Sequence, residues 1–151
     1  MNPYNHQLHL YDKNQPENLA FLRRLRALMD DYGAAAVGEV GDSQRGLEIL
    51  GEYTSGNGLM QMCYAFEFLA PEPLTPEVVR NTQNAFATAA PEGWACWAFS
   101  NHDVVRHVSR WAAHANKDAF ARLTATMLLT MRGSVCLYQG EELGLTEAEL
   151  S

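Results

Sequence analysis

The sequence is poor in positive charge and in cysteine, and each shortage excludes a class of protein. Its 11 Lys and Arg residues stand against 18 Asp and Glu, which gives a formal net charge of -7 over 151 residues. Nucleic acid is therefore not an expected partner, because binding to phosphates needs a basic surface. The three cysteines, Cys63, Cys96 and Cys136, are odd in number and lie in apolar runs, so we expect reduced core thiols rather than disulfides.

Several motifs and segments are also missing. No Cys-x-x-Cys or His-x-x-x-His spacing occurs, so a zinc site is not expected. No Gly-rich phosphate loop opens a helix, which argues against a nucleotide-binding sheet. The sequence has no apolar stretch long enough to cross a membrane, and its N-terminus lacks the basic start and apolar run of a signal peptide. We therefore expect a cytoplasmic protein without a membrane partner and without a cofactor in this segment.

What the sequence does contain is an alternation of short apolar runs with helical patterns. Strands buried on both faces are short apolar runs without polar alternation, as in residues 34–40. Helices are indicated by apolar residues at three- and four-residue steps and by capping residues such as Thr75. This alternation predicts an α/β fold built from parallel β/α units. The predicted strands are residues 34–40, 60–69, 94–100 and 134–139, and the predicted helices are residues 16–32, 47–52, 75–90, 104–113 and 116–131.

Charged and polar side chains follow three of the predicted strands. They are Glu39, the Asn101-His102-Asp103 triplet, and the Glu141-Glu142 pair. In parallel β/α barrels the reactive groups lie at the carboxyl ends of the strands. A carboxyl group that emerges from apolar surroundings has a raised pKa unless it is paired, and this prepares it to act as a general acid. Converging carboxylates with a histidine suggest glycoside hydrolysis.

Each candidate also has a plainer structural interpretation. Glu39 taken alone could be an ordinary loop residue, and Asn101 and Asp103 could cap the helix that follows them. His102, between two polar residues at a strand end, is harder to explain as a core residue.

The remaining candidates lean toward structure. The Glu141-Glu142 pair favours a helix start, where carboxylates are stabilised by the helix dipole. His107 falls on a predicted helix and His114 directly follows it, so we expect them to be core residues more readily than site residues.

Three segments, VGEVGD, FSNHDVVRHVSRW and RGSVCLYQGEELGL, closely resemble successive signature regions of glycoside hydrolase family 13, the α-amylase family. The N-terminal segment and the stretch into AFEFLAPE are similar to its α-glucosidase and oligo-1,6-glucosidase branch. The resemblance covers nearly the whole chain. It implies that residues 1–151 are a partial catalytic (β/α)8 TIM barrel domain, namely its C-terminal half with about strands five to eight, truncated at both ends.

The resemblance also implies roles for single residues. Glu39 matches the family's general acid/base, and Asp103 matches the carboxylate that stabilises the transition state. His102 and Asp103 match the pair that holds the glucose hydroxyls, and Asn101 and Arg106 are expected to take part in substrate binding beside them. The residues alone would also allow Asp103 as the nucleophile of a retaining scheme. The family's own nucleophile is an aspartate in a Gly-Phe-Arg-x-Asp motif, which does not occur in this sequence.

These roles lead to a functional expectation with alternatives. We expect a retaining α-glucosidase that hydrolyses terminal α-glucosidic bonds of oligosaccharides or disaccharides, and we expect the 151 residues alone to be inactive without the nucleophile. The family's structural calcium or magnesium would bind in a loop outside this segment. A half barrel leaves strand edges unpaired, so the segment is expected to self-associate. The alternatives are a transglycosylase or sugar isomerase of the trehalose or isomaltulose synthase type, and a non-catalytic barrel relative.

Overall fold

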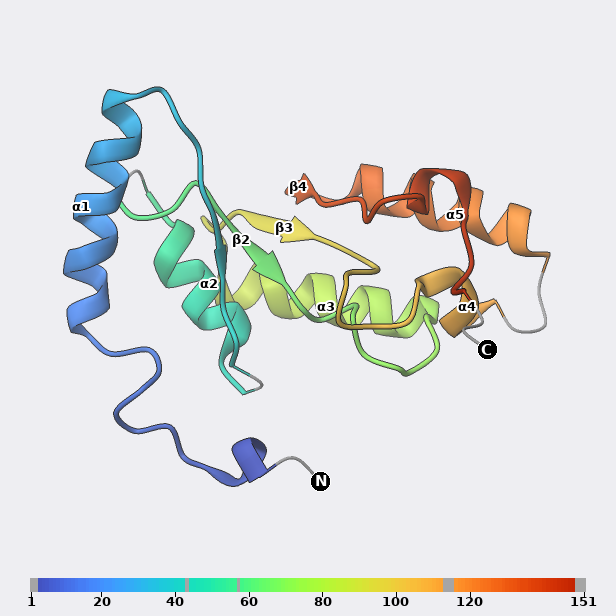
Figure 1. Cartoon of the computed structure of the whole chain (residues 1–151), viewed down its shortest axis with the longest axis horizontal. Helices are drawn as coiled ribbons and strands as arrows, with labels where there is room; N and C mark the ends of the chain where they lie inside the picture. The colour runs from blue at the N-terminus through green and yellow to red at the C-terminus, as the bar shows by residue number, and fades with distance from the viewer. Residues whose placement is uncertain (1–2, 43, 57, 113–115, 149–151) are drawn as a thin grey trace.

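Four short parallel strands form a single sheet in the order β1-β2-β3-β4, so strands that are consecutive in the chain are neighbours in space (Figure 1). The computed structural model describes residues 3–42, 44–56, 58–112 and 116–148. The strands are β1 (Val37–Glu39), β2 (Met62–Ala65), β3 (Ala95–Trp97) and β4 (Ser134–Val135). Parallel neighbours joined by helical crossovers are the β/α units that the sequence predicted, and this prediction is confirmed.

The helices lie close to their predicted positions. They are α1 (Glu17–Asp31), α2 (Gly46–Thr54), α3 (Pro76–Ala89), α4 (His107–Trp111) and α5 (Lys117–Thr130), with two 3-10 turns, η1 (Pro3–His6) and η2 (Glu141–Leu143). The predicted cap of α3 is confirmed, because Thr75 Oγ1 accepts a hydrogen bond from the backbone N–H of Val78 at 3.2 Å. No helix within the described ranges is long and apolar enough to cross a membrane.

Three local predictions are wrong. The strands are shorter than expected, and β4 has only two residues. The run 34–40 was predicted to be covered on both faces, but β1 lies at the edge of the sheet and Val37 is 55% exposed. The helix predicted from residue 104 begins at His107, because the side chain of Asn101 turns the chain by accepting the N–H groups of Asp103 and Val104.

Trp97 of β3 occupies the centre of the hydrophobic core. Its ring is fully buried, and the ring centroids of Phe68 and Phe86 lie 5.5 Å and 5.2 Å from its own. The indole N–H donates to the carbonyl of Arg132 at 2.8 Å, so the one polar atom of the side chain is satisfied. This core fixes β3, and therefore the loop that follows its carboxyl end.

The three cysteines are free thiols, as predicted. Cys63 and Cys96 are buried, and burial raises the pKa of each thiol to about 11. Cys136 is only half-buried at the end of β4.

Candidate functional site

Glu39 is the last residue of β1 and lies in register with Tyr64 of the neighbouring strand. The residue before it, Gly38, lies opposite Cys63, and a Cβ atom at this glycine would stand 2.8 Å from the Cys63 Sγ atom. A side chain here would therefore push β1 away from β2. The glycine allows the close approach of the strands that places Glu39 beside Tyr64.

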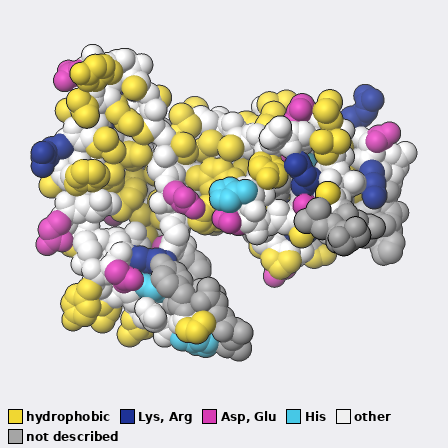
Figure 2. Space-filling view, viewed as in Figure 1, with side chains coloured by type: hydrophobic (Ala, Val, Ile, Leu, Met, Phe, Trp, Pro, Cys, Tyr) yellow, Lys and Arg dark blue, Asp and Glu magenta, His cyan; other side chains and the backbone are white. Residues whose placement is uncertain are grey.

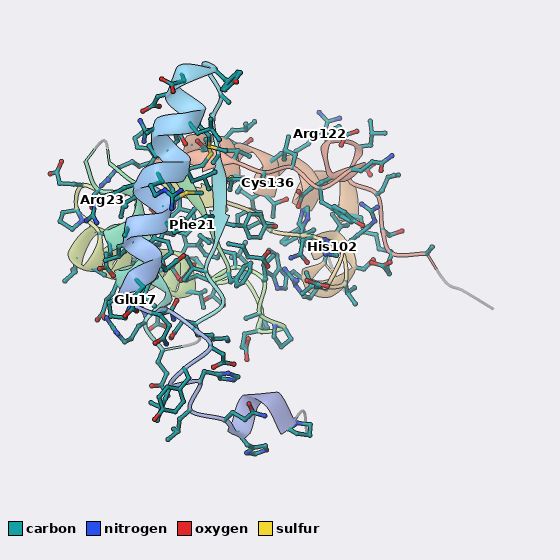
Figure 3. All side chains as sticks on the ribbon, turned by 60° about the vertical axis from the view of Figure 1, so that its left-hand side comes forward. Glu17, Phe21, Arg23, His102, Arg122 and Cys136 are labelled. Atoms are coloured by element: carbon teal, nitrogen blue, oxygen red, sulfur yellow. The ribbon has the colours of Figure 1, made fainter. Side chains whose placement is uncertain are left out.

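A pocket of about 340 Å³ opens at the carboxyl ends of the strands. It brings together Glu39 from β1 with Asn101 and His102 from the loop after β3, although these residues are far apart in the sequence. Figure 3 labels His102 and Cys136, two lining residues that come from the ends of neighbouring strands. The other lining residues are Val37, Gly38, Tyr64, Ser100, Leu137 and Tyr138. The strand-end prediction of converging carboxylates is met only in part, because Glu39 and His102 line the pocket whereas Asp103, Glu141 and Glu142 do not.

His102 and Asp103 extend into solvent at the mouth of this region. Their side chains are 82% and 71% exposed, and His102 Nε2 lies 3.7 Å from Asp103 Oδ1. That distance is too long for a hydrogen bond, so the pair is not locked together. In the middle of the face shown in Figure 2, a histidine lies beside acidic side chains. Both groups are therefore accessible to a ligand, although Asp103 does not itself line the pocket.

Asn101 has a structural role in addition to its place in the pocket. Its Oδ1 atom accepts the backbone N–H groups of Asp103 at 2.9 Å and Val104 at 3.1 Å, which forms a turn ahead of α4. Asn101 does not cap this helix, as the plainer interpretation had it, because α4 begins only at His107 and has no side-chain cap. Its side chain also bonds to Tyr64. Burial raises the pKa of Tyr64 to about 12, and the Asn101 hydrogen bond opposes part of this increase. The phenol of Tyr64 is thus neutral at physiological pH and can serve as a hydrogen-bond donor in the pocket.

Arg106 lies outside the pocket lining and connects two loops instead. Its Nη1 atom donates to the carbonyl of Gln139 at 2.6 Å, and its guanidinium carbon lies 4.7 Å from the ring centroid of Tyr138. Its backbone N–H donates to Glu147 Oε2 at 3.0 Å. The supporting role of Arg106 toward substrate stays a prediction.

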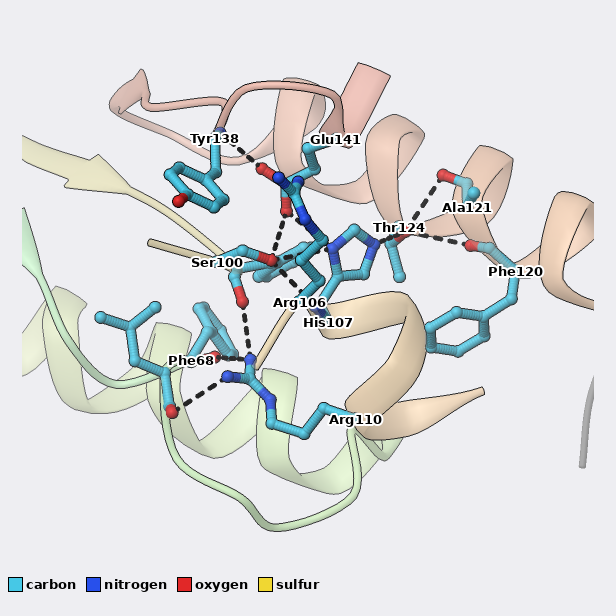
Figure 4. Close-up of polar contacts among 12 residues, drawn as sticks. Phe68, Ser100, Arg106, His107, Arg110, Phe120, Ala121, Thr124, Tyr138 and Glu141 are labelled. Carbon is cyan, nitrogen blue, oxygen red and sulfur yellow. Dashed lines mark hydrogen bonds and ion pairs between the residues drawn. The ribbon is translucent and has the colours of Figure 1, made fainter. Parts of the chain in front are cut away.

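A buried polar cluster contacts the pocket-lining residues Ser100 and Tyr138 (Figure 4). His107 Nδ1 is 2.7 Å from Glu141 Oε1, and the two side chains are only 3% and 4% exposed. The sequence correctly predicted that His107 is a core residue and that Glu141 opens a helical turn. It did not predict their pairing, because the two residues are joined only by the tertiary fold. His114 lies outside the described residues.

Two further charged side chains, those of Arg110 and Glu67, are partly buried near the strand ends. Arg110 donates to the backbone carbonyls of Phe68 at 2.9 Å and Phe99 at 2.6 Å, and this joins the chain after β2 to the chain after β3. Burial lowers the pKa of this guanidinium from its ordinary value. Glu67 shows the opposite shift, since burial raises the pKa of its carboxyl group, and its Oε2 atom has no hydrogen-bond partner among the described residues.

A second pocket, of about 640 Å³, lies between residues 7–16 and the loop that follows Glu39. Lys13 Nζ donates to the carbonyl of Gly41 at 2.7 Å and Asn14 Nδ2 donates to Asp42 Oδ2 at 3.0 Å, so the N-terminal segment is attached to this loop. None of the predicted site residues lines this pocket. Within the described ranges, no group of three His, Cys, Asp or Glu side chains is arranged to hold a metal ion.

Comparison with known proteins adds sequence relatives to this geometry. The profile of the family described as "Alpha amylase, catalytic domain" matches residues 2–151. The chain is 68% identical to a probable alpha-glucosidase of Rhizobium meliloti (strain 1021), over 99% of this chain and 28% of that protein. It is 30% identical to an oligo-1,6-glucosidase of Heyndrickxia coagulans, over 93% of this chain and again 28% of the relative.

Two solved structures are similar to this chain. The alpha-glucosyl transfer enzyme XgtA superposes with a TM-score of 0.89 at 48% identity, over 99% of this chain and 28% of that one. An alpha-amylase from Anoxybacillus superposes with a TM-score of 0.60 at 21% identity, which bears on the fold alone, over 87% of this chain and 30% of that one. The chain thus spans between a quarter and a third of the length of these relatives.

Proposed function

Because this chain belongs to the α-amylase family, glycoside hydrolase family 13, we propose that the protein to which these residues belong is a retaining α-glucosidase. Its substrates are oligosaccharides or disaccharides with a terminal α-glucosidic bond. The observation that carries the proposal is the pocket that gathers Glu39, Asn101 and His102 at the carboxyl ends of parallel strands. The 68% identity to a probable alpha-glucosidase supports the same choice.

In this proposal Glu39 is the general acid/base. It protonates the glycosidic oxygen as the bond to the leaving sugar breaks, and it later removes a proton from the water that releases the glucose. The exposed end of β1 leaves this carboxyl group accessible for both transfers. His102 holds glucose hydroxyl groups, and the negative charge of Asp103 stabilises the positive charge that develops on the sugar ring.

The nucleophile is supplied by another part of the protein. A retaining glycosidase needs a second carboxylate that bonds to the sugar, and the family's Gly-Phe-Arg-x-Asp motif does not occur in residues 1–151. We place the four strands of this chain as about strands five to eight of a (β/α)8 barrel. The strand with the nucleophile would then precede β1 in the closed barrel.

Glucosyl transfer is a second candidate. XgtA, at 48% identity, is described as an alpha-glucosyl transfer enzyme. Hydrolysis and transfer share the same covalent glucosyl-enzyme and differ only in whether water or a second hydroxyl group receives the sugar. Glu39, His102 and Asp103 would act in the same way in both reactions.

The test is to follow maltose cleavage by the full-length protein with proton NMR. Retention predicts that α-glucose appears first from the nonreducing end and only later equilibrates with the β anomer. Immediate release of β-glucose would contradict the retaining mechanism, and no cleavage of any α-glucoside would reject the proposal. Accumulation of longer saccharides, with one glucose released per maltose cleaved instead of two, would favour the transfer reaction.

A further inference from the structure

Two loops form one wall of the candidate pocket. The first follows β3 and carries Ser100, Asn101 and His102, and the second follows β4 and carries Leu137 and Tyr138. The strands that lead into these loops, β3 and β4, pair with each other over only two residues of β4. The geometry of the pocket therefore depends on contacts beyond the sheet.

One carboxylate contacts both loops. Glu141 Oε1 accepts a hydrogen bond from Ser100 Oγ at 3.1 Å, and Oε2 accepts one from the backbone N–H of Tyr138 at 2.9 Å (Figure 4). The Nδ1 atom of His107 is the third partner, at 2.7 Å from Oε1. An ionised carboxylate only accepts hydrogen bonds, so the imidazole must carry its hydrogen on this nitrogen.

The imidazole is fixed on its other side as well. His107 Nε2 lies 2.8 Å from Thr124 Oγ1 of α5, and the backbone N–H of His107 donates to Ser100 Oγ at 2.9 Å. The cluster thus closes a ring from Ser100 to His107 to Glu141 and back to Ser100. The ring is anchored to α5, a helix that packs on the core through the fully buried Leu128.

Stability alone does not explain this cluster. Removing interacting polar groups from water is costly, and apolar side chains of similar volume often hold helices together as well or better. Apolar side chains could not, however, direct three hydrogen bonds to one residue and thereby set the distance between two loops. The hydrogen bonds are directional, so they restrict position more narrowly than packing does.

We propose that His107 and Glu141, together with Ser100, are positioning residues that hold the two pocket-lining loops as one rigid unit. The constraint passes along the chain, because Ser100 precedes Asn101, and Asn101 in turn fixes the backbone of Asp103. The backbone that carries His102 and Asp103 is thereby held beside the loop that carries Tyr138. The catalytic part of this inference rests on the proposed function, since it takes an α-glucoside as the substrate.

The test compares Glu141→Gln and Ser100→Ala with Glu142→Gln in the full-length protein. Glu142 is the exposed neighbour in the same turn, so it is a matched control. Hydrogen exchange measured by mass spectrometry should increase together in peptides that cover residues 100–106 and 136–140 of the first two variants. The value of kcat for maltose, per folded molecule, should fall about 10- to 100-fold, with KM within about threefold. Glu142→Gln should change neither readout.

Several outcomes would overturn the inference. Exchange that stays unchanged, or that increases only in the second loop, would show that the cluster does not couple the loops. A kcat per folded molecule within about twofold of wild type would show that the cluster serves folding alone. If Glu141→Gln fails to fold, Ser100→Ala decides, because it removes a single hydroxyl group. If the wild-type protein cleaves no α-glucoside, the proposed function fails, and the exchange measurement still decides whether the loops are coupled.

Discussion

Two carboxylates of this chain, one buried and one partly buried, are in opposite situations. Glu141 receives hydrogen bonds from Ser100 and the backbone of Tyr138 and pairs with His107. Glu67, in the loop after β2, has one oxygen without a partner among the described residues, and burial raises the pKa of its carboxyl group. A carboxylate that is partly removed from water and has too few donors is destabilising when charged. The folded protein therefore holds the proton of Glu67 more tightly than the unfolded chain does.

This difference predicts a pH-dependent gain in stability for Glu67→Gln. Because the pKa is raised in the folded state, the native protein binds more protons, and its stability falls as pH rises above the ordinary glutamate value near 4.5. A glutamine has no charge to bury, so its advantage in melting temperature over wild type should be smallest near pH 4 and grow toward neutral pH.

Thermal unfolding across that pH range checks this prediction, with Glu52→Gln on the exposed side of α2 as the control. An advantage that is constant with pH would mean that Glu67 ionises normally in the folded protein.

At the scale of single elements, the sequence predicted those features that depend on neighbouring residues in the chain. Thr75 was predicted to cap α3 and does so, because a cap depends only on the residues of the first turn. The exposure of β1 was not predictable in this way, since whether a strand is covered depends on distant parts of the chain. The same reason explains why the pairing of His107 with Glu141 was missed, whereas the strand-end position of Glu39 followed from the short apolar run that contains it.

The cap of α3 gives a prediction at this scale. Thr75→Ala removes the acceptor of the Val78 N–H and should lower the free energy of unfolding by about 1 kcal/mol. Thr88→Ala is the matched control, because Thr88 is exposed near the other end of the same helix and bonds only to the Asn84 carbonyl of its own helix. Urea unfolding should separate the two variants. Equal losses from both would contradict the capping account.

At the scale of the whole molecule, the sheet has two open edges within the described residues. β1 and β4 each pair on one side only, and apolar side chains near these strands are exposed, namely Val37 at 55% and Leu137 at 43%. Further exposed apolar side chains lie on or next to α1, where Figure 2 shows hydrophobic atoms at the surface: they are Phe21, Leu28 and Tyr32. A closed (β/α)8 barrel would pair both edges, which fits our placement of these strands within such a barrel.

Residues 1–151 expressed alone should therefore associate and should not turn over α-glucosides. Unpaired strand edges with apolar side chains promote contact between copies, and the covalent intermediate cannot form without a nucleophile. Light scattering after size-exclusion chromatography checks the first point, and Val37→Lys should reduce association because a charge on the edge strand opposes pairing. A monomeric polypeptide with the activity of the full-length protein would contradict both points.

The most direct test of the account is the cleavage of two substrates by full-length Glu39→Gln, with Glu92→Gln as the control because Glu92 lies ahead of the opposite end of β3. Maltose cleavage should fall by about 10²- to 10⁴-fold, since the leaving sugar needs a proton. With an aryl α-glucoside, the rate of forming the glucosyl-enzyme should fall much less, because a phenolate leaves without that proton. Added azide should then restore turnover by attacking the glucosyl-enzyme to form the α-glucosyl azide. Equal losses on both substrates without rescue by azide, or unchanged maltose cleavage, would show that Glu39 is not the general acid/base.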